Sequence, residues 1–130
     1  MVNSYKGFDR RESLRVKAEF IVIYKVNSPL EIYMWIGNRE VHALMLDLSE
    51  NGMAILTEHS LPVSTILLSK FTLINLCAEK SERIRSMEIT GQVRNSVLSK
   101  GNEYRLGIFF TKITTENKCA IASFVKMAAN

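Results

Sequence analysis

Two short polar stretches of this chain carry the side chains best suited to binding a ligand, and the first of them suits an anion. The first spans residues 9–15 and contains Arg10, Arg11 and Arg15, directly before the first apolar run. A guanidinium group stays charged at any working pH, and its planar donors fit a phosphate or the O6/N7 edge of guanine. Arg11 and Arg15 are four residues apart, so one helical turn places them side by side, and an extended arm lets them grip a ligand from two directions. The alternative is a solvated basic tail without a ligand.

The second stretch runs from Asp47 to Gly52 with the sequence Asp-Leu-Ser-Glu-Asn-Gly. Its Asn-Gly pair is a strong signal for a tight turn between two strands, because both residues tolerate positive φ. The carboxylate of Asp47 and the hydroxyl of Ser49 are acceptors for N–H groups. Taken alone, the pattern is also ordinary turn chemistry, in which both side chains bond only their own backbone.

The net charge of +4 is concentrated at the N-terminus. Residues 1–17 hold five cations and two acids, so the rest of the chain is close to neutral. This asymmetry suits a small anionic partner that meets the N-terminal arm. An extended nucleic acid would favour a broader basic face.

Few other residues support catalysis or metal binding. His42 and His59 have no carboxylate or thiol at metal-ligand spacing, and we interpret them as ordinary strand and loop residues. The serines lie in no nucleophile-elbow context, and the sequence contains no Gly-rich phosphate loop. We therefore expect no enzymatic activity, no metal and no cofactor.

The sequence lacks the marks of a membrane or secreted protein. No apolar run approaches the roughly 20 residues needed to cross a bilayer, and the N-terminus has no apolar signal segment. Cys77 and Cys119 form no Cys-x-x-Cys pair, and we interpret them as reduced, partly buried thiols. These observations predict a cytoplasmic protein without membrane insertion.

The pattern of apolar residues predicts a β-rich single domain. Alternation indicates six strands, at residues 16–25, 39–48, 53–57, 66–78, 86–97 and 103–110, with Val93 and Val97 on one apolar face of the fifth. Residues 29–38 are hard to place, and we interpret 30–38 as a strand extension or an irregular loop over one end of the core. Helical spacing then predicts a C-terminal helix over residues 114–127, with Thr114 as its cap.

These elements predict an all-β fold with a terminal helix, namely a six-stranded antiparallel β-barrel plus a C-terminal α-helix. Closure suits a short β chain because it leaves no exposed strand edge. In this arrangement residues 1–15 form a flexible basic arm, residues 16–110 form the barrel, and residues 114–127 form a helical lid.

The order of the two polar stretches resembles the PilZ family, bacterial domains that bind the second messenger cyclic di-GMP. The first reads Arg11-Glu-Ser-Leu-Arg15, preceded by Arg10, and the second is Asp-x-Ser-x-x-Gly from Asp47 to Gly52. Gly91-Gln-Val93 and Leu106-Gly107-Ile108-Phe109-Phe110 continue the likeness, which covers roughly residues 8 to 126. The resemblance implies a single PilZ-like domain over residues 1–130. The chain departs from the family in a longer span between the motifs and in Ser64, where the family often has glycine.

The resemblance implies a role for each motif residue. Arg11 and Arg15 are expected to hold a phosphate and a guanine O6/N7 edge, and Asp47 to accept the N1–H and N2–H₂ groups of guanine. Ser49 either bonds the base or holds the turn, and Gly52 lets the backbone pass close to the ligand. Arg10 and Arg94 stay open, because each either contacts the ligand or faces solvent.

The function implied is that of a non-enzymatic receptor for cyclic di-GMP. The arm is expected to be free before binding, to fold over the ligand against the turn, and so to form a surface for a downstream protein partner. One alternative is an adaptor of the same family that binds no nucleotide. Another is an oligonucleotide-binding barrel, which needs exposed aromatic residues for base stacking. The four strand aromatics Phe20, Tyr24, Tyr104 and Phe110 fall on apolar faces, so we expect no nucleic acid partner.

Overall fold

The computed structural model describes residues 14–129 of the chain. Its strands, in chain order, are β2 (Val16–Lys17), β3 (Ile21–Ser28), β4 (Val41–Ser49), β5 (Gly52–Thr57), β6 (Ile66–Ile74), β7 (Ile84–Leu98) and β8 (Tyr104–Lys112). The helices are α1 (Leu30–Ile36), between β3 and β4, and α2 (Thr115–Ala128), after β8. A single turn of 3₁₀-helix, η1 (Lys80–Glu82), connects β6 to β7.

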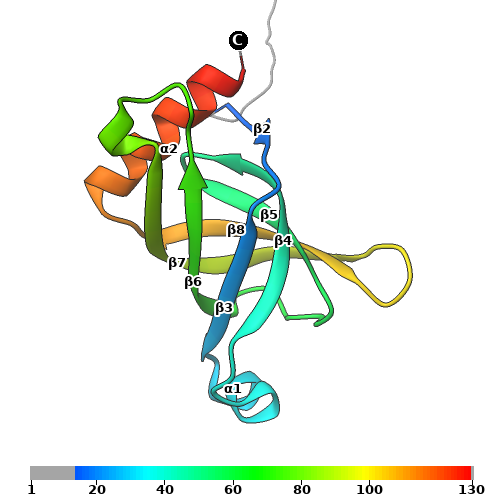
Figure 1. Cartoon of the computed structure of the whole chain (residues 1–130). Helices are drawn as coiled ribbons and strands as arrows, with labels where there is room; N and C mark the ends of the chain where they lie inside the picture. The colour runs from blue at the N-terminus through cyan, green and yellow to red at the C-terminus, as the bar shows by residue number, and fades with distance from the viewer. Residues whose placement is uncertain (1–13, 130) are drawn as a thin grey trace, which may run out of the picture.

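Six of the strands close into an antiparallel barrel (Figure 1). Hydrogen-bonded neighbours follow the order β4-β3-β6-β7-β8-β5, and β5 pairs back onto β4 to complete the ring. The short strand β2 adds to the end of β4 outside this ring. The predicted fold class, a six-stranded antiparallel barrel with a C-terminal helix, is confirmed.

The first predicted strand, residues 16–25, is divided into two pieces. Both β2 and β3 pair with β4, with Val16 opposite Leu48 and Ile21 opposite Leu44. Between them the chain stays close to β4, since Met45 donates its N–H to the carbonyl of Phe20 at 2.8 Å. The interruption leaves a two-residue strand that holds the chain after Arg15 against the end of β4.

Two β-bulges reverse the inward and outward alternation on β4 and β7. On β4, Met45 lies opposite Ile55 but Asp47 lies opposite Ala54, so one extra residue is accommodated between them. The same irregularity falls between Val93 and Asn95 on β7. A bulge of this kind reorients the side chains that follow it. The prediction that Val97 shares the buried face of Val93 is wrong for this reason, and Val97 is 59% exposed.

Most of the segment over residues 30–38 is the helix α1, Leu30–Ile36, so its interpretation as a strand extension or irregular loop is wrong. Ile32, Tyr33 and Ile36 fall on one face of α1 and pack against the core. An apolar run this short is compatible with either period, and only contact with the barrel end selects the helix. The helix ends at Gly37, whose φ of 82° is in the region that glycine favours and whose N–H bonds the Tyr33 carbonyl at 2.6 Å.

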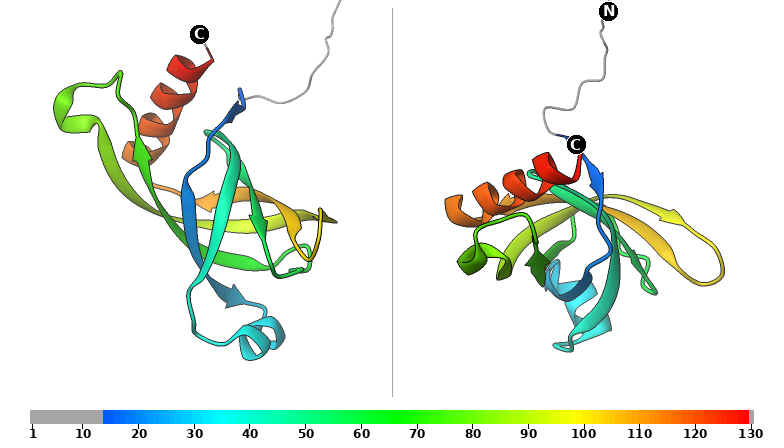
Figure 2. Two further views of the ribbon diagram at one scale, coloured as in Figure 1. Left: turned by 45° about the vertical axis from the view of Figure 1, so that its right-hand side comes forward. Right: turned by 45° about the horizontal axis from the view of Figure 1, so that its top comes forward.

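Helix α2 lies across one end of the barrel, as Figure 2 shows in two views. It begins as predicted at Thr114, whose hydroxyl accepts the N–H of Asn117 at 3.1 Å. Ile121 and Val125 enter the core, and the ring of Phe124 lies 5.5 Å from that of Phe20. The helix therefore covers one end of the barrel.

Both cysteines differ from the expectation of partial burial. Cys77 and Cys119 are free thiols with exposed side chains. Cys77 lies beyond the end of β6 because Asn75 stops the strand, its side-chain oxygen accepting the Cys77 N–H at 3.1 Å. This turn also explains why β6 ends at Ile74 and not at residue 78 as predicted.

The phenol of Tyr24 is buried in the barrel and supplies a prediction about alkaline stability. It hydrogen-bonds Thr57 at 2.8 Å, and burial raises the pKa of Tyr24 to about 12 because the phenolate would lose its hydration. A raised pKa stabilises the fold below the ordinary value near 10, and this stabilisation is lost as the pH rises from 10 through 12.

We expect Tyr24→Phe to cost about 1–3 kcal/mol at pH 8, because it leaves the Thr57 hydroxyl buried without a partner. At pH 11 the difference in free energy of unfolding between the variant and the wild type should be smaller by about 1.4 kcal/mol. At that pH the wild type loses stability because its phenol stays protonated in the folded state and ionises in the unfolded state. Urea unfolding at the two pH values measures it. A difference that stays constant with pH would contradict the raised pKa of Tyr24.

Candidate functional site

A polar hollow of about 510 Å³ opens on the outer face of the barrel over β4, β5, β8 and β7. Its volume is within the range of about 300–1,000 Å³ typical of ligand pockets. Its lining includes three guanidinium groups and one carboxylate, so the net charge of the lining is positive. The polar residues of its lining are Arg15, Asp47, Ser49, Asn51, Arg94, Asn95 and Arg105.

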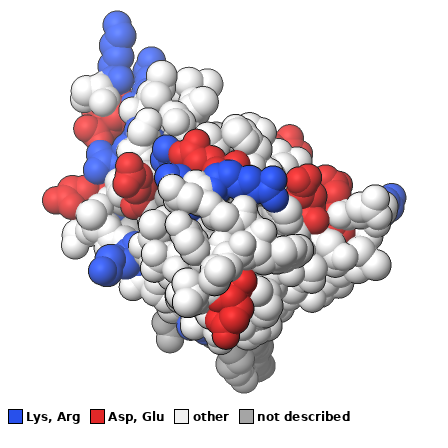
Figure 3. All heavy atoms as spheres, turned by 90° about the horizontal axis from the view of Figure 1, so that it is seen from below, with Lys and Arg blue, Asp and Glu red and all other residues white. Residues whose placement is uncertain are grey.

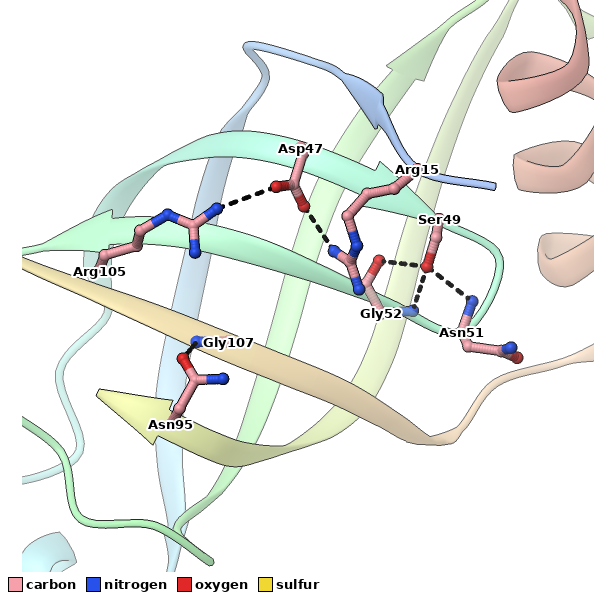
Figure 4. A network of polar contacts seen from close by, with 8 residues as sticks. All are labelled: Arg15, Asp47, Ser49, Asn51, Gly52, Asn95, Arg105 and Gly107. Carbon is pink, nitrogen blue, oxygen red and sulfur yellow. Dashed lines mark hydrogen bonds and ion pairs between the residues drawn. The ribbon is translucent and has the colours of Figure 1, made fainter. Parts of the chain in front are cut away.

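The carboxylate of Asp47 is held between two arginines, as Figure 4 shows. Arg15 Nη1 donates to Asp47 Oδ1 at 2.5 Å, and Arg105 Nη2 donates to Asp47 Oδ2 at 3.1 Å. The Asp47 side chain is only 17% exposed, whereas the side chains of Arg15 and Arg105 are 33% and 48% exposed. Both oxygens of the carboxylate are therefore engaged while both guanidinium groups still reach solvent.

Each of these three side chains is positioned by a different strand contact. The bulge on β4 turns Asp47 outward, away from the face of Met45. The pairing of β2 with β4 brings Arg15, the residue before β2, beside the same strand. Arg105 comes from β8, which is 58 residues further along the chain than Asp47 and is separated from β4 by β5.

Ser49 holds the turn in this structure. Its hydroxyl accepts the N–H groups of Asn51 and Gly52, at 3.3 and 3.1 Å, and donates to the Gly52 carbonyl at 3.3 Å. One hydroxyl has a single proton and two lone pairs, so its capacity is fully used. Ser49 is also 0% exposed, and in this structure it supports the site from below.

Gly52 is required by the neighbouring strand. A Cβ atom at this position would lie 2.3 Å from the carbonyl oxygen of Ile108 on β8. Gly52 is the first residue of β5 and pairs with Ser49, so the two-residue turn consists of Glu50 and Asn51. Neither Asn51 nor Gly52 has positive φ, so the hairpin exists as predicted but the expected reason for its Asn-Gly pair is wrong.

Small residues form the floor of the hollow. The sheet register sets Asp47, Ala54, Gly107 and Asn95 in one row across β4, β5, β8 and β7. Because neighbouring strands lie about 4.8 Å apart, the row spans about 14 Å between the backbones of Asp47 and Asn95. Asn95 Oδ1 accepts the N–H of Gly107 at 3.1 Å, which fixes its amide at the far end of this row.

Arg94 and Phe109 form a stacked pair beside Asn95. The guanidinium carbon of Arg94 lies 4.3 Å from the centre of the Phe109 ring, and Arg94 Nε donates to Gln92 Oε1 at 3.0 Å. Both residues line the hollow, and Phe109 is 39% exposed. A guanidinium plane held in this way can present its other face to a purine.

The structure unites some of the predicted site residues and leaves others outside the described residues. Arg15, Asp47, Ser49 and Gly52 lie together, and Arg94 lines the same hollow. Arg10 and Arg11 lie outside the part of the chain that the structure describes, and so does the expected folding of the arm over the ligand.

Three residues of the hollow, Arg105, Asn95 and Phe109, were not predicted. Arg105 and Phe109 occupy the outward positions of β8, alternating with the buried Leu106 and Ile108, so their exposure could be read from the sequence. The sequence could not show which residues of the other strands lie beside them.

A second hollow of about 530 Å³ lies on the wall formed by β3, β6 and β7. Its lining includes Ile23 and Leu68, and its Lys70 is paired with Glu40 at 3.0 Å. Within residues 14–129, no group of three or more His, Cys, Asp or Glu side chains is placed to hold a metal ion, and no helix has the length and apolar character to span a membrane.

A closed antiparallel barrel with a helical lid and an arginine-lined hollow on its outer face defines a small β-barrel module suited to anionic ligands. The family model of the PilZ domain matches residues 9–126. The chain therefore belongs to the PilZ domain family.

Solved structures with the same fold include proteins of Bacillus subtilis and Escherichia coli. The Bacillus subtilis inhibitor of motility, MotI/DgrA, is 19% identical over 92% of this chain, with a TM-score of 0.68. This chain spans about half of that protein, since only 51% of it is covered. The PilZ domain of YcgR from Escherichia coli, solved with c-di-GMP, is 14% identical with a TM-score of 0.58, over 93% of this chain and 92% of that domain. Identities this low establish the shared fold alone. No curated protein sequence matched the chain.

Proposed function

We propose that this chain is a non-enzymatic receptor for cyclic di-GMP and that the hollow around Asp47 is its binding site. The observation that carries the proposal is the clasp of Arg15 and Arg105 on Asp47, at the edge of a hollow of about 510 Å³. Membership of the PilZ family and the fold shared with a c-di-GMP-bound domain support the choice of ligand.

Each part of the ligand has a chemically matched group at this site. The Asp47 carboxylate is the acceptor for the N1–H and N2–H₂ groups of guanine, and Arg11 and Arg15 bind phosphate and the O6/N7 edge. Hydrogen bonds between a guanidinium and a phosphate are charge-assisted and belong to the strong class. Arg10 adds a further cation beside Arg11. Ser49 and Gly52 contribute by holding the turn that presents Asp47.

The structure gives little support to the alternative function of an oligonucleotide-binding barrel. Tyr24 and Phe110 are 0% and 6% exposed, and Phe20 and Tyr104 pack against the core, so these four rings offer no platform for stacked bases. Seen from the α1 end, the surface carries acidic groups beside its basic ones and no broad basic face (Figure 3).

The receptor would act through a protein partner that reads the surface formed by ligand, arm and barrel. A ligand shifts such an equilibrium only by binding one state better than the other. The two exposed free thiols suit the reducing bacterial cytoplasm, where we place the receptor.

Calorimetric titration of the purified protein with cyclic di-GMP tests the proposal. We expect saturable binding that GTP does not reproduce, because GTP presents one guanine and no cyclic diphosphate. If the titration gives no binding heat, the result would instead support a PilZ adaptor that binds no nucleotide. Binding to single-stranded DNA with a steep dependence on salt would favour the oligonucleotide-binding barrel.

A further inference from the structure

The two arginines on Asp47 occupy the acceptor that guanine needs. Guanine presents N1–H and N2–H₂ as adjacent donors, and a guanidinium group presents adjacent N–H donors in much the same way. Oδ1 accepts from Arg15 and Oδ2 from Arg105, and the Asp47 side chain is only 17% exposed, so both guanidinium groups compete with a guanine edge for this carboxylate. Release of one arginine would give the base a full carboxylate oxygen to bind.

Of the two arginines, Arg105 is the one more easily released from Asp47. Its bond to Asp47 is the longer of the two, 3.1 Å against 2.5 Å, and its side chain is the more exposed, 48% against 33%. Ion pairs with this much exposure are weak, since water competes for both groups. Arg15 is also restrained by the pairing of β2 with β4, directly after it in the chain.

A released Arg105 stays at the hollow. It projects from the outward face of β8, two residues before Gly107, and lines the hollow together with Ala54 and Gly107. Neither of these residues has a side chain long enough to separate a ligand from the sheet. A phosphate lying over the row from Asp47 to Asn95 would therefore be within reach of the Arg105 guanidinium.

We propose that Arg105 is a ligand-binding residue that exchanges Asp47 for a phosphate of the bound nucleotide. This inference rests on the proposed function and extends it to a residue on β8 that lies outside both sequence motifs. When guanine takes Asp47 Oδ2, Arg105 loses one anionic partner and gains another. The exchange leaves Arg105 beside an anion both before and after the ligand binds.

Arg105→Ala tests the exchange with two ligands that differ in charge. Calorimetry is run with cyclic di-GMP at low and high salt, and binding of neutral guanosine is followed by NMR shifts. We expect Arg105→Ala to bind cyclic di-GMP about tenfold more weakly, the value of one charge-assisted hydrogen bond. Its salt dependence should be shallower than that of the wild type, and its affinity for guanosine should be unchanged or higher.

Two further variants make the result specific. Arg105→Lys keeps the charge and should bind cyclic di-GMP more tightly than Arg105→Ala. Arg83→Ala removes an exposed arginine that does not line the hollow and should bind like wild type. Thermal unfolding of each variant shows whether the barrel is retained.

Each outcome bears on one proposal. If the wild type does not bind cyclic di-GMP, the proposed function fails, whatever the variants do. If the wild type binds and Arg105→Ala binds equally well, the exchange is overturned and the receptor function stands. Equal weakening for guanosine and cyclic di-GMP also overturns the exchange, because Arg105 would then serve only to position Asp47.

Discussion

Arg15→Ala is expected to weaken the binding of cyclic di-GMP by roughly 2–5 kcal/mol, the range found when one partner of a close charge pair is truncated. Arg15 makes the shorter of the two bonds to Asp47, and its side chain is 33% exposed and lines the hollow. Removing it takes away a cation for the ligand and also loosens the carboxylate that receives guanine. Calorimetric titration of the variant and of the wild type measures the loss.

Arg11→Ala should produce a loss of the same order, since the family motif assigns both arginines to the ligand. Arg83→Ala is the matched control and should change affinity little, because this arginine does not line the hollow and donates to the Ala78 carbonyl in the connection between β6 and β7. If Arg11→Ala and Arg15→Ala both bind like the wild type, the ligand site lies elsewhere on the barrel.

Gly52→Ala is expected to destabilise the fold by about 3 kcal/mol, near the upper end of overpacking effects in cores. The new Cβ would lie 2.3 Å from the Ile108 carbonyl oxygen, so β5 and β8 would have to separate where Gly52 faces Phe109. Backbone atoms on both sides leave no flexible side chain to absorb the shift. Urea unfolding of the variant against the wild type gives the value.

Glu50→Ala, in the same turn, is the control for this substitution and should stay within about 0.5 kcal/mol of the wild type. A Gly52→Ala variant that unfolds at the same urea concentration as the wild type would contradict the steric explanation. If that stable variant also lost cyclic di-GMP binding, the glycine would serve the ligand, which is what the sequence suggested.

Much of the fold could be predicted because its main signals are local. Alternation along β6, β7 and β8 reflects a barrel with one buried face, and the change to helical spacing after Thr114 marks α2. The errors occurred where a local pattern is ambiguous or interrupted. Residues 30–36 form a helix only because the barrel end covers one side of them, and Val97 changes face because of a bulge.

The candidate site was predictable only in the part that two motifs encode. Asp47 shares the parity of the buried Met45, so strict alternation would bury it, and the bulge on β4 turns it out. Arg105 and Asn95 carry no motif. Their place at the hollow follows from the register of β5 with β8 and of β8 with β7.

The sequence by itself determined the identity of the strands, the C-terminal helix and the two polar stretches, because each depends on side-chain types at short spacing. The tertiary structure alone decided which side chains meet across the sheet. Closure of the barrel carries β8 to within two strands of β4, and two bulges set which residues face the hollow. The physical reason is that strand register depends on pairings between residues as far apart as Gly52 and Phe109, which are 57 positions apart and which no local pattern records.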